Sequence, residues 1–174
     1  MRERNEKGFT LAEVMISAAI LGVGVMGMAA MQGISFTKNV DANDLSIVTN
    51  VAADMMERIQ SNRRLAWAYN GLDTNGPGNC LAGGLPAPAP LPPFKTAPLV
   101  LAQTQAIQGD CTQWLTLITA TNLLNARGRV TVIPVPPVSA YSNAMDVMVQ
   151  VQWNERTGAQ RTRSVAFRTQ IEPE

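Results

Sequence analysis

The apolar positions of the chain follow three successive spacings. The first is a continuous run from Phe9 to Met31, in which Glu13 is the only charged residue. As a helix, these 23 residues would span roughly 35 Å, more than the ~30 Å hydrocarbon core of a bilayer. The run continues past Ala29 and Ala30 without the boundary that a secretory signal has at its cleavage site. We therefore expect a transmembrane helix over residues 9–32 and not an ordinary cleaved secretory signal.

The second spacing is helical and amphipathic. Apolar residues recur at positions 48, 51, 52, 55 and 59, with charged residues such as Asp54 and Glu57 between them. This stripe predicts that one helix of roughly 80 Å continues from Phe9 to about Arg64. Four glycines make its middle the weakest part, and they favour either close packing against neighbouring helices or a local bend (Gly22, Gly24, Gly27 and Gly33).

The third spacing is the alternation that is typical of strands. Val147, Val149, Val151 and Trp153 alternate with other side chains, which predicts a strand over 144–153 with one buried face. Further strands are expected over 129–135 and, after a turn at 154–159, over 160–171. The fold class is therefore α+β, with an antiparallel sheet of three or four strands covered by the apolar stripe of the long helix.

Between the long helix and the sheet, the sequence predicts a connection and a shorter helix. Residues 70–98 are rich in glycine and proline, which predicts an extended surface connection or, alternatively, a polyproline ligand for a partner. Asp73-Thr-Asn75-Gly resembles the start of a calcium loop, but proline at position 77 favours a plain turn. A helix is expected over 110–124, with Asp110 as its N-cap and Gly128 after its end.

Charges and cysteines indicate on which side of a membrane the chain folds. Three basic residues outnumber two acidic ones in residues 1–8, and positive charge beside a span favours the cytoplasmic side. The remainder would then lie outside the cytoplasm. There, Cys80 and Cys111 suggest a disulfide, worth roughly 3–4 kcal/mol in the chain-entropy model. The alternative is that they are two unrelated buried thiols.

The composition argues against most enzymes. The chain has no histidine, which excludes Ser-His-Asp and Cys-His nucleophile systems and imidazole ligands for zinc. We therefore expect no catalytic residues, no metal and no cofactor. Four arginines near Trp153 and Phe167 could form a DNA-binding patch, but a solvated strand face is the favoured interpretation, so no nucleic acid is expected (Arg156, Arg161, Arg163 and Arg168).

The first 30 residues resemble a type IV prepilin. The motif is a short basic leader, Gly8, Phe9-Thr-Leu, Glu13 and a long apolar helix. This pattern is shared by pilins and by the pseudopilins of type II secretion. More loosely, ADMMERIQSN, GDCTQWL and VMVQVQW resemble the PilV group of minor pilins. Ala12 departs from the bulkier residue that often precedes the glutamate.

The resemblance implies roles for three residues. Prepilin peptidase would remove residues 1–8 by cutting between Gly8 and Phe9, and it would methylate the new amine of Phe9. Glu13 would neutralise the Phe9 amine of an adjoining subunit in the fibre. Since a carboxylate in an apolar bundle needs a partner, this role is physically reasonable. The alternative is that Glu13 pairs with its own amine near the positive end of its own helix.

The function implied is that of a minor pilin with a pilin-like α+β fold. Residues 9–32 would form the transmembrane and fibre-core helix, and 33–174 the amphipathic helix and globular head. The protein would sit in the inner membrane with its head in the periplasm, and after assembly in a pilus on the cell surface. Its partners would be prepilin peptidase, other minor pilins, the major pilin and the inner-membrane assembly platform. The alternatives are a type II secretion pseudopilin or a signal-anchored periplasmic enzyme or binding domain.

Overall fold

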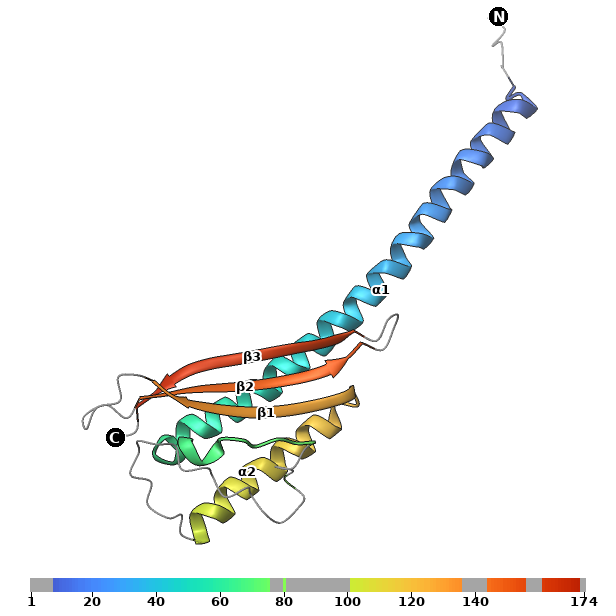
Figure 1. The fold of residues 1–174 in the computed structure, drawn as a ribbon. Coiled ribbons are helices and arrows are strands. Elements are labelled where there is room, and N and C mark those ends of the chain that lie inside the picture. Colours follow the sequence, from blue (N-terminus) through green and yellow to red (C-terminus); the bar gives the residue numbers. More distant parts are fainter. Residues whose placement is uncertain (1–7, 76–79, 81–100, 136–143, 156–160, 173–174) are drawn as a thin grey trace, which may run out of the picture. The chain divides into compact units, whose positions relative to one another are not determined.

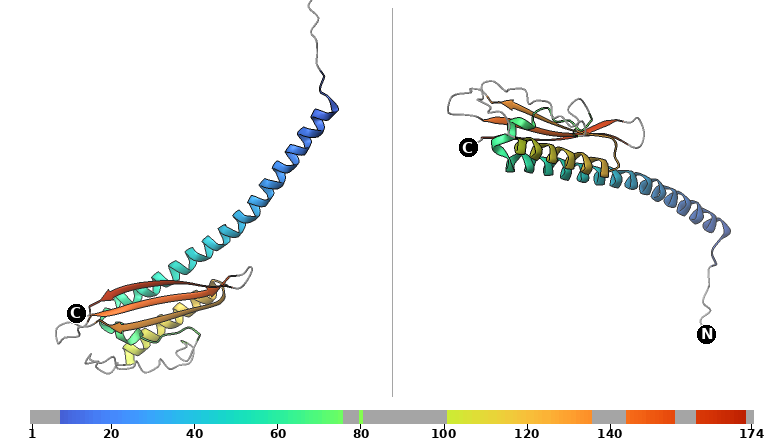
Figure 2. Two further views of the ribbon diagram at one scale, coloured as in Figure 1. Left: turned by 45° about the horizontal axis from the view of Figure 1, so that its top comes forward. Right: turned by 90° about the horizontal axis from the view of Figure 1, so that it is seen from below.

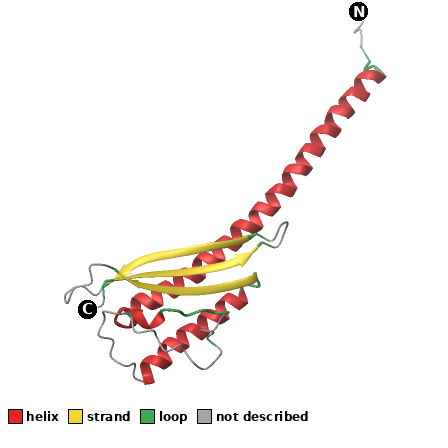
Figure 3. Ribbon diagram, in the orientation of Figure 1, coloured by secondary structure: helices red, strands yellow, loops and turns green. Residues whose placement is uncertain are grey.

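A computed structural model of the chain describes residues 8–75, 80, 101–135, 144–155 and 161–172. Most of the leader, most of the proline-rich connection, and Arg156 and Gly158 lie outside the described residues. The chain divides into two compact units, Met1–Ala42 and Asn43–Glu174. Figures 1 and 3 show the elements, which in chain order are α1 (Leu11–Ser61), η1 (Arg63–Tyr69), α2 (Leu101–Ala120), β1 (Leu124–Pro134), β2 (Met145–Asn154) and β3 (Thr162–Ile171).

The predicted long helix is confirmed in α1. It begins two residues after Phe9 and ends at Ser61, after which the chain tightens into the 3-10 helix η1. The α-helix is continuous from Gly22 to Gly33, and a Cβ added at any of the four glycines in this stretch would meet no atom within 4 Å. Close packing at these glycines would therefore have to come from another chain.

The apolar stripe of α1 forms part of the core of the second unit. Val48, Ala52, Met55 and Ile59 have no exposed surface, and Val51 and Met56 are also buried. These side chains join one hydrophobic cluster with residues of η1, α2 and the sheet. The stripe therefore covers the sheet, as the helical spacing of apolar positions predicted.

The sheet is antiparallel in the order β1-β2-β3. In β2, buried residues alternate strictly with half-buried ones, which confirms the predicted strand; Trp153 is only 3% exposed. β1 begins at Leu124 and not at Arg129, and β3 begins at Thr162 and not at 160. Figure 2 shows α2 beside the C-terminal part of α1, with both helices on one face of the sheet, and Trp114 Nε1 of α2 donates to Val51 O of α1 at 3.0 Å.

The predicted bounds of the second helix were wrong. α2 begins at Leu101, nine residues before Asp110, so Asp110 lies in the helix and is not its N-cap. The helix ends at Ala120, and Asn122 beyond it adopts a left-handed φ of 53°. Gly128 lies in β1, where an added Cβ would collide with the ring of Trp114. Gly128 therefore allows α2 to pack closely against the sheet, and it does not end the helix.

The first residues of the connection lie along the free edge of β1. Gly71 N donates to Val130 O at 3.1 Å, Val130 N donates to Leu72 O at 2.9 Å, and Thr74 N donates to Gly128 O at 3.0 Å. These bonds satisfy backbone groups that an uncovered edge strand would leave to water. Farther along, buried Cys80 is joined to buried Cys111 of α2 by a disulfide, with their Cα atoms 5.4 Å apart.

Candidate processing and assembly site

The predicted cleavage bond, between Gly8 and Phe9, lies before α1 in a stretch that is neither helix nor strand. Gly8, Phe9 and Thr10 are exposed and non-helical, and the Phe9 side chain is 88% exposed. A Cβ placed on Gly8 would meet nothing within 4 Å. Since proteases act on exposed chain that they can bind in an extended form, this geometry suits a substrate position.

Glu13 takes part in a reciprocal hydrogen-bonded cap at the start of α1. Its Oε2 accepts from Thr10 N at 3.0 Å and from Thr10 Oγ1 at 2.9 Å, and its own backbone N donates to Thr10 Oγ1 at 3.3 Å. This is the capping box formed by Thr at the N-cap and Glu three residues later. The sequence signal for this cap is Thr10-Leu-Ala-Glu13, and the cap is not among the features predicted above.

The cap gives Glu13 a partner within its own chain before any cleavage. In the uncut chain Phe9 N belongs to a peptide bond, so no amine exists there to neutralise the carboxylate. Instead, Thr10 donates two hydrogen bonds to the Glu13 carboxylate. The side-chain oxygens of Glu13 and Thr10 in turn accept from the backbone N–H groups of Thr10 and Glu13, which would otherwise lack acceptors at the start of the helix.

The helix that follows the cap is apolar and uncovered. From Leu11 to Val40 every residue is exposed, and among the described residues α1 is the one helix long and apolar enough to cross a membrane. None of its apolar window is buried within the chain. This surface needs lipid or other apolar helices as its surroundings. Its large apolar side chains include Val14, Ile16, Ile20, Leu21, Val25 and Met28.

A polar cluster in the head joins α1, η1 and α2. Asp110 accepts from Tyr69 Oη at 2.6 Å and from Arg58 NH1 at 3.2 Å, while Arg58 Nε donates to Asp54 at 2.7 Å. Asn62 Nδ2 donates to Tyr69 Oη at 3.1 Å. Burial raises the pKa of Tyr69, and the neighbouring Asp110 raises it further, so the hydroxyl remains a proton donor. The cluster fixes three elements beside Cys111.

Asp73, considered as a first ligand of a calcium loop, is bound to two arginines. Its carboxylate accepts from Arg127 Nε at 2.7 Å and from Arg129 NH2 at 3.2 Å, and Asn75 N donates to it at 3.0 Å. Burial acts to raise the pKa of Asp73, but the bonds from Arg127 and Asn75 outweigh burial and lower the pKa. The segment is a turn, as the sequence favoured, and its carboxylate holds it to β1.

Two of the four arginines near the end of the sheet form ion pairs with acidic side chains. Arg168 pairs with Asp146, and Arg163 pairs with Glu155. Trp153 faces the core. This arrangement agrees with a solvated strand face, whereas Arg156 lies outside the described residues.

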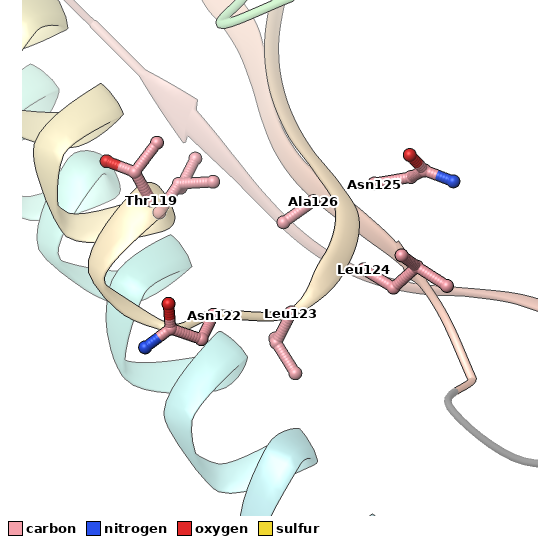
Figure 4. A pocket seen from close by; sticks show the side chains of 7 residues that line it. Thr119, Asn122, Leu123, Leu124, Asn125 and Ala126 are labelled. Carbon is pink, nitrogen blue, oxygen red and sulfur yellow. The ribbon is translucent and has the colours of Figure 1, made fainter.

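An open pocket of about 720 Å³ lies where α2 turns into β1 (Figure 4). Its lining combines apolar side chains with polar ones that form local hydrogen bonds: Thr119 Oγ1 donates to Leu115 O at 2.7 Å, and Asn122 Nδ2 donates to Ala120 O at 3.4 Å. It contains no acidic, basic or thiol side chain. Within the described ranges, no group of three Asp, Glu, Cys or His residues could hold a metal ion. The lining residues are Ile118, Thr119, Asn122, Leu123, Leu124, Asn125 and Ala126.

Comparison with known proteins identifies the N-terminal segment. Residues 4–29 match the family model of the prokaryotic N-terminal methylation motif. Neither the curated proteins nor the solved structures gave a match. The matched segment includes the predicted cleavage bond, the capping box and the apolar run as far as residue 29. The long helix followed by a three-stranded antiparallel sheet is consistent with a pilin-like α+β fold. A class III signal motif and this helix fit membrane anchoring, and together they support a type IV pilin-like or pseudopilin-type protein.

Proposed function

We propose that the protein is a minor pilin, a structural subunit without catalytic activity that helps to prime type IV pilus assembly at or near the tip. The observation that carries this proposal is the methylation motif at 4–29, followed by an exposed apolar helix and a disulfide-tied head. The looser resemblance to the PilV group favours a minor over a major subunit. Pilus-dependent adhesion or twitching motility would then depend on it.

Maturation begins with prepilin peptidase at the Gly8–Phe9 bond. The exposure of both residues and their position before the helix support this step. The peptidase then methylates the new amine of Phe9. Residues 1–8 remain on the cytoplasmic side until the cut, and the head lies in the periplasm, as the basic leader favours.

Glu13 changes partners during assembly. In the precursor it belongs to the cap with Thr10, and in the fibre it neutralises the Phe9 amine of an adjoining subunit. The charge supports this exchange, because a carboxylate in an apolar bundle requires a cation or several hydrogen bonds. The surrounding helices are those of the major pilin and other minor pilins, delivered by the inner-membrane assembly platform.

Deletion of the gene tests the function. We expect few surface pili, restoration by the full chain, and recovery of an epitope-tagged full chain in sheared fibres at low copy near one end. Secreted proteins in the same strain are the control. Normal pili with lost secretion would assign the chain to a type II pseudopilus, whereas a hydrolytic activity of the purified full chain would favour the periplasmic enzyme.

A further inference from the structure

The two edges of the sheet differ in whether another described segment pairs with them. The outer edge of β1 is covered by residues 70–75 of the connection through backbone hydrogen bonds and the bridge between Asp73 and Arg129. β3 lies at the opposite edge (Figure 1), and among the described residues no strand or loop pairs with its outer side. Within the part of the chain that the structure describes, one edge is thus paired with residues 70–75 and the other has no pairing segment.

β3 is regular along its whole length. It pairs with β2 from Ile171 opposite Met145 to Thr162 opposite Asn154 without a register shift, whereas β1 has an irregularity between Leu124 and Arg127. Residues 162–171 contain neither proline nor glycine. Proline and bulges are devices by which edge strands avoid further pairing, and β3 has neither.

The core-facing side of β3 leaves apolar surface incompletely covered. Val165 and Phe167 are only partly buried, although their partners on β2, Val151 and Val149, are at most 1% exposed. An additional strand beside β3 would place its own inward side chains against these two residues. Cross-strand contacts of aromatic and β-branched residues stabilise such pairs.

The charges on β3 restrict which strand fits. Residues 161–171 include Arg161, Arg163 and Arg168 and no acidic residue. Arg161 is exposed, Arg163 pairs with Glu155, and the Arg168 side chain is 71% exposed although it pairs with Asp146. A second copy of β3 would bring basic strands together, which like-charge repulsion disfavours. An amphipathic strand that carries acidic residues would be complementary.

We propose that the outer edge of β3 is a strand-pairing interface for an extended, acid-bearing segment of a different subunit. The inference rests on the proposed function, because that function supplies a neighbouring subunit. Pairing of this kind takes its affinity from backbone hydrogen bonds and its specificity from alternate side chains. Here an added strand would contact the partly buried side chains of Val165 and Phe167 on one face of the sheet, and Arg168 lies on the other face.

Residue-resolved hydrogen exchange of the full chain tests the interface. The chain is compared in envelopes of cells that carry the assembly system and in membranes of a host that produces this chain alone. We expect alternate amides of β3 to exchange at least ~10-fold more slowly in the first sample, because their outward N–H groups gain acceptors. Amides of β2, already paired on both sides, serve as the internal control and should not differ. Equal exchange of β3 in both samples would overturn the proposal.

A charge exchange tests the chemistry of the partner. Asp146→Arg combined with Arg168→Asp keeps opposite charges in contact but reverses the charge on the edge strand. We expect the added protection of β3 to fall about ten-fold while the melting temperature stays near that of the wild type, since a surface pair contributes little. Unchanged protection in this variant would contradict the acid-bearing partner. Recovery in sheared fibres is scored separately, because its absence, with β3 protected in envelopes, would reject the pilus function and not the interface.

Discussion

The hydroxyl of Tyr69 donates a hydrogen bond of 2.6 Å to Asp110, one residue before the half-cystine Cys111. This bond joins η1 to α2 across 41 residues of sequence. The Tyr69→Phe variant should lower the free energy of unfolding by about 1–3 kcal/mol, because the half-buried carboxylate of Asp110 loses one of its donors and keeps the bond from Arg58. Chemical unfolding of the full chain in detergent measures this. Thr116→Val on the exposed face of α2 is the control. Equal losses of unfolding free energy in the two variants would show that the bond between Tyr69 and Asp110 stabilises the fold no more than an exposed threonine hydroxyl does.

Removal of the disulfide should have a larger effect. Cys80→Ala with Cys111→Ala opens a loop with a sequence separation of 31 residues. Loss of up to about 3–4 kcal/mol is expected in the chain-entropy model. Unfolding of the oxidised wild type, the reduced wild type and the double variant measures the loss. An oxidised wild type no more stable than the double variant would contradict the expectation.

Asp73 should make the stability of the head depend on pH. Its pKa is lowered in the folded chain, so its bonds with Arg127 and Asn75 stabilise the fold fully above the unfolded pKa of about 3.9. This stabilisation is lost as the pH falls through the lower folded value. The wild type should therefore lose more stability than Asp73→Asn between pH 5 and pH 2. Parallel curves for the two proteins would show that Asp73 contributes nothing to acid unfolding.

Glu13 offers variants that separate its two roles. Glu13→Gln keeps an acceptor for Thr10 but removes the charge, since glutamine also forms a capping box. Glu13→Ala removes both. Both should still be cut, and if the charge drives assembly, both should be poorly incorporated into fibres. Normal incorporation of Glu13→Gln together with poor incorporation of Glu13→Ala would instead assign the requirement to the cap. Immunoblots of membranes and sheared fibres measure both steps.

Thr10 provides the complementary test. Thr10→Ala removes the hydroxyl that donates to Glu13 and accepts from its amide, while Thr10→Ser retains it. Loss of an N-cap costs about 1 kcal/mol, so the first turn of the helix should fray. Faster amide exchange at residues 11–14 in Thr10→Ala, but not in Thr10→Ser, is the expected result. Similar exchange in the two variants would mean that the cap does not hold this turn.

Cleavage itself is tested at Gly8. Gly8→Ala or a larger residue should leave the precursor uncut in the membrane, because a side chain hinders close approach of a protease to the backbone. The mass of the membrane-bound chain distinguishes the precursor from the mature form. Wild-type maturation of this variant would refute the processing step, and Gly33→Ala is a control at a helical glycine with open space around it.

Some features could be predicted from local pattern and others could not. The stripe through Val48 and Ile59 and the alternation in β2 were correct, because burial follows the periodicity of helix and strand. The prediction that Asp110 is an N-cap was wrong. A short polar residue before an apolar run commonly begins a helix, but Asp110 lies inside α2. Its real partners are Tyr69 and Arg58, 41 and 52 residues away. The cap of Thr10 and Glu13 was readable, since both residues lie within one turn.

The cap lies entirely within residues that the mature chain retains. Removal of residues 1–8 would therefore leave the bonds between Thr10 and Glu13 intact, so that cleavage changes the charge at the helix start without changing its shape. The new amine of Phe9 would then stand beside the positive end of the helix dipole, where a cation is unfavourable. The carboxylate of the subunit's own Glu13, bonded to Thr10 in the same turn, would offset this cost, so the amine of a neighbouring subunit would have to compete with Thr10 and with the chain's own amine for Glu13.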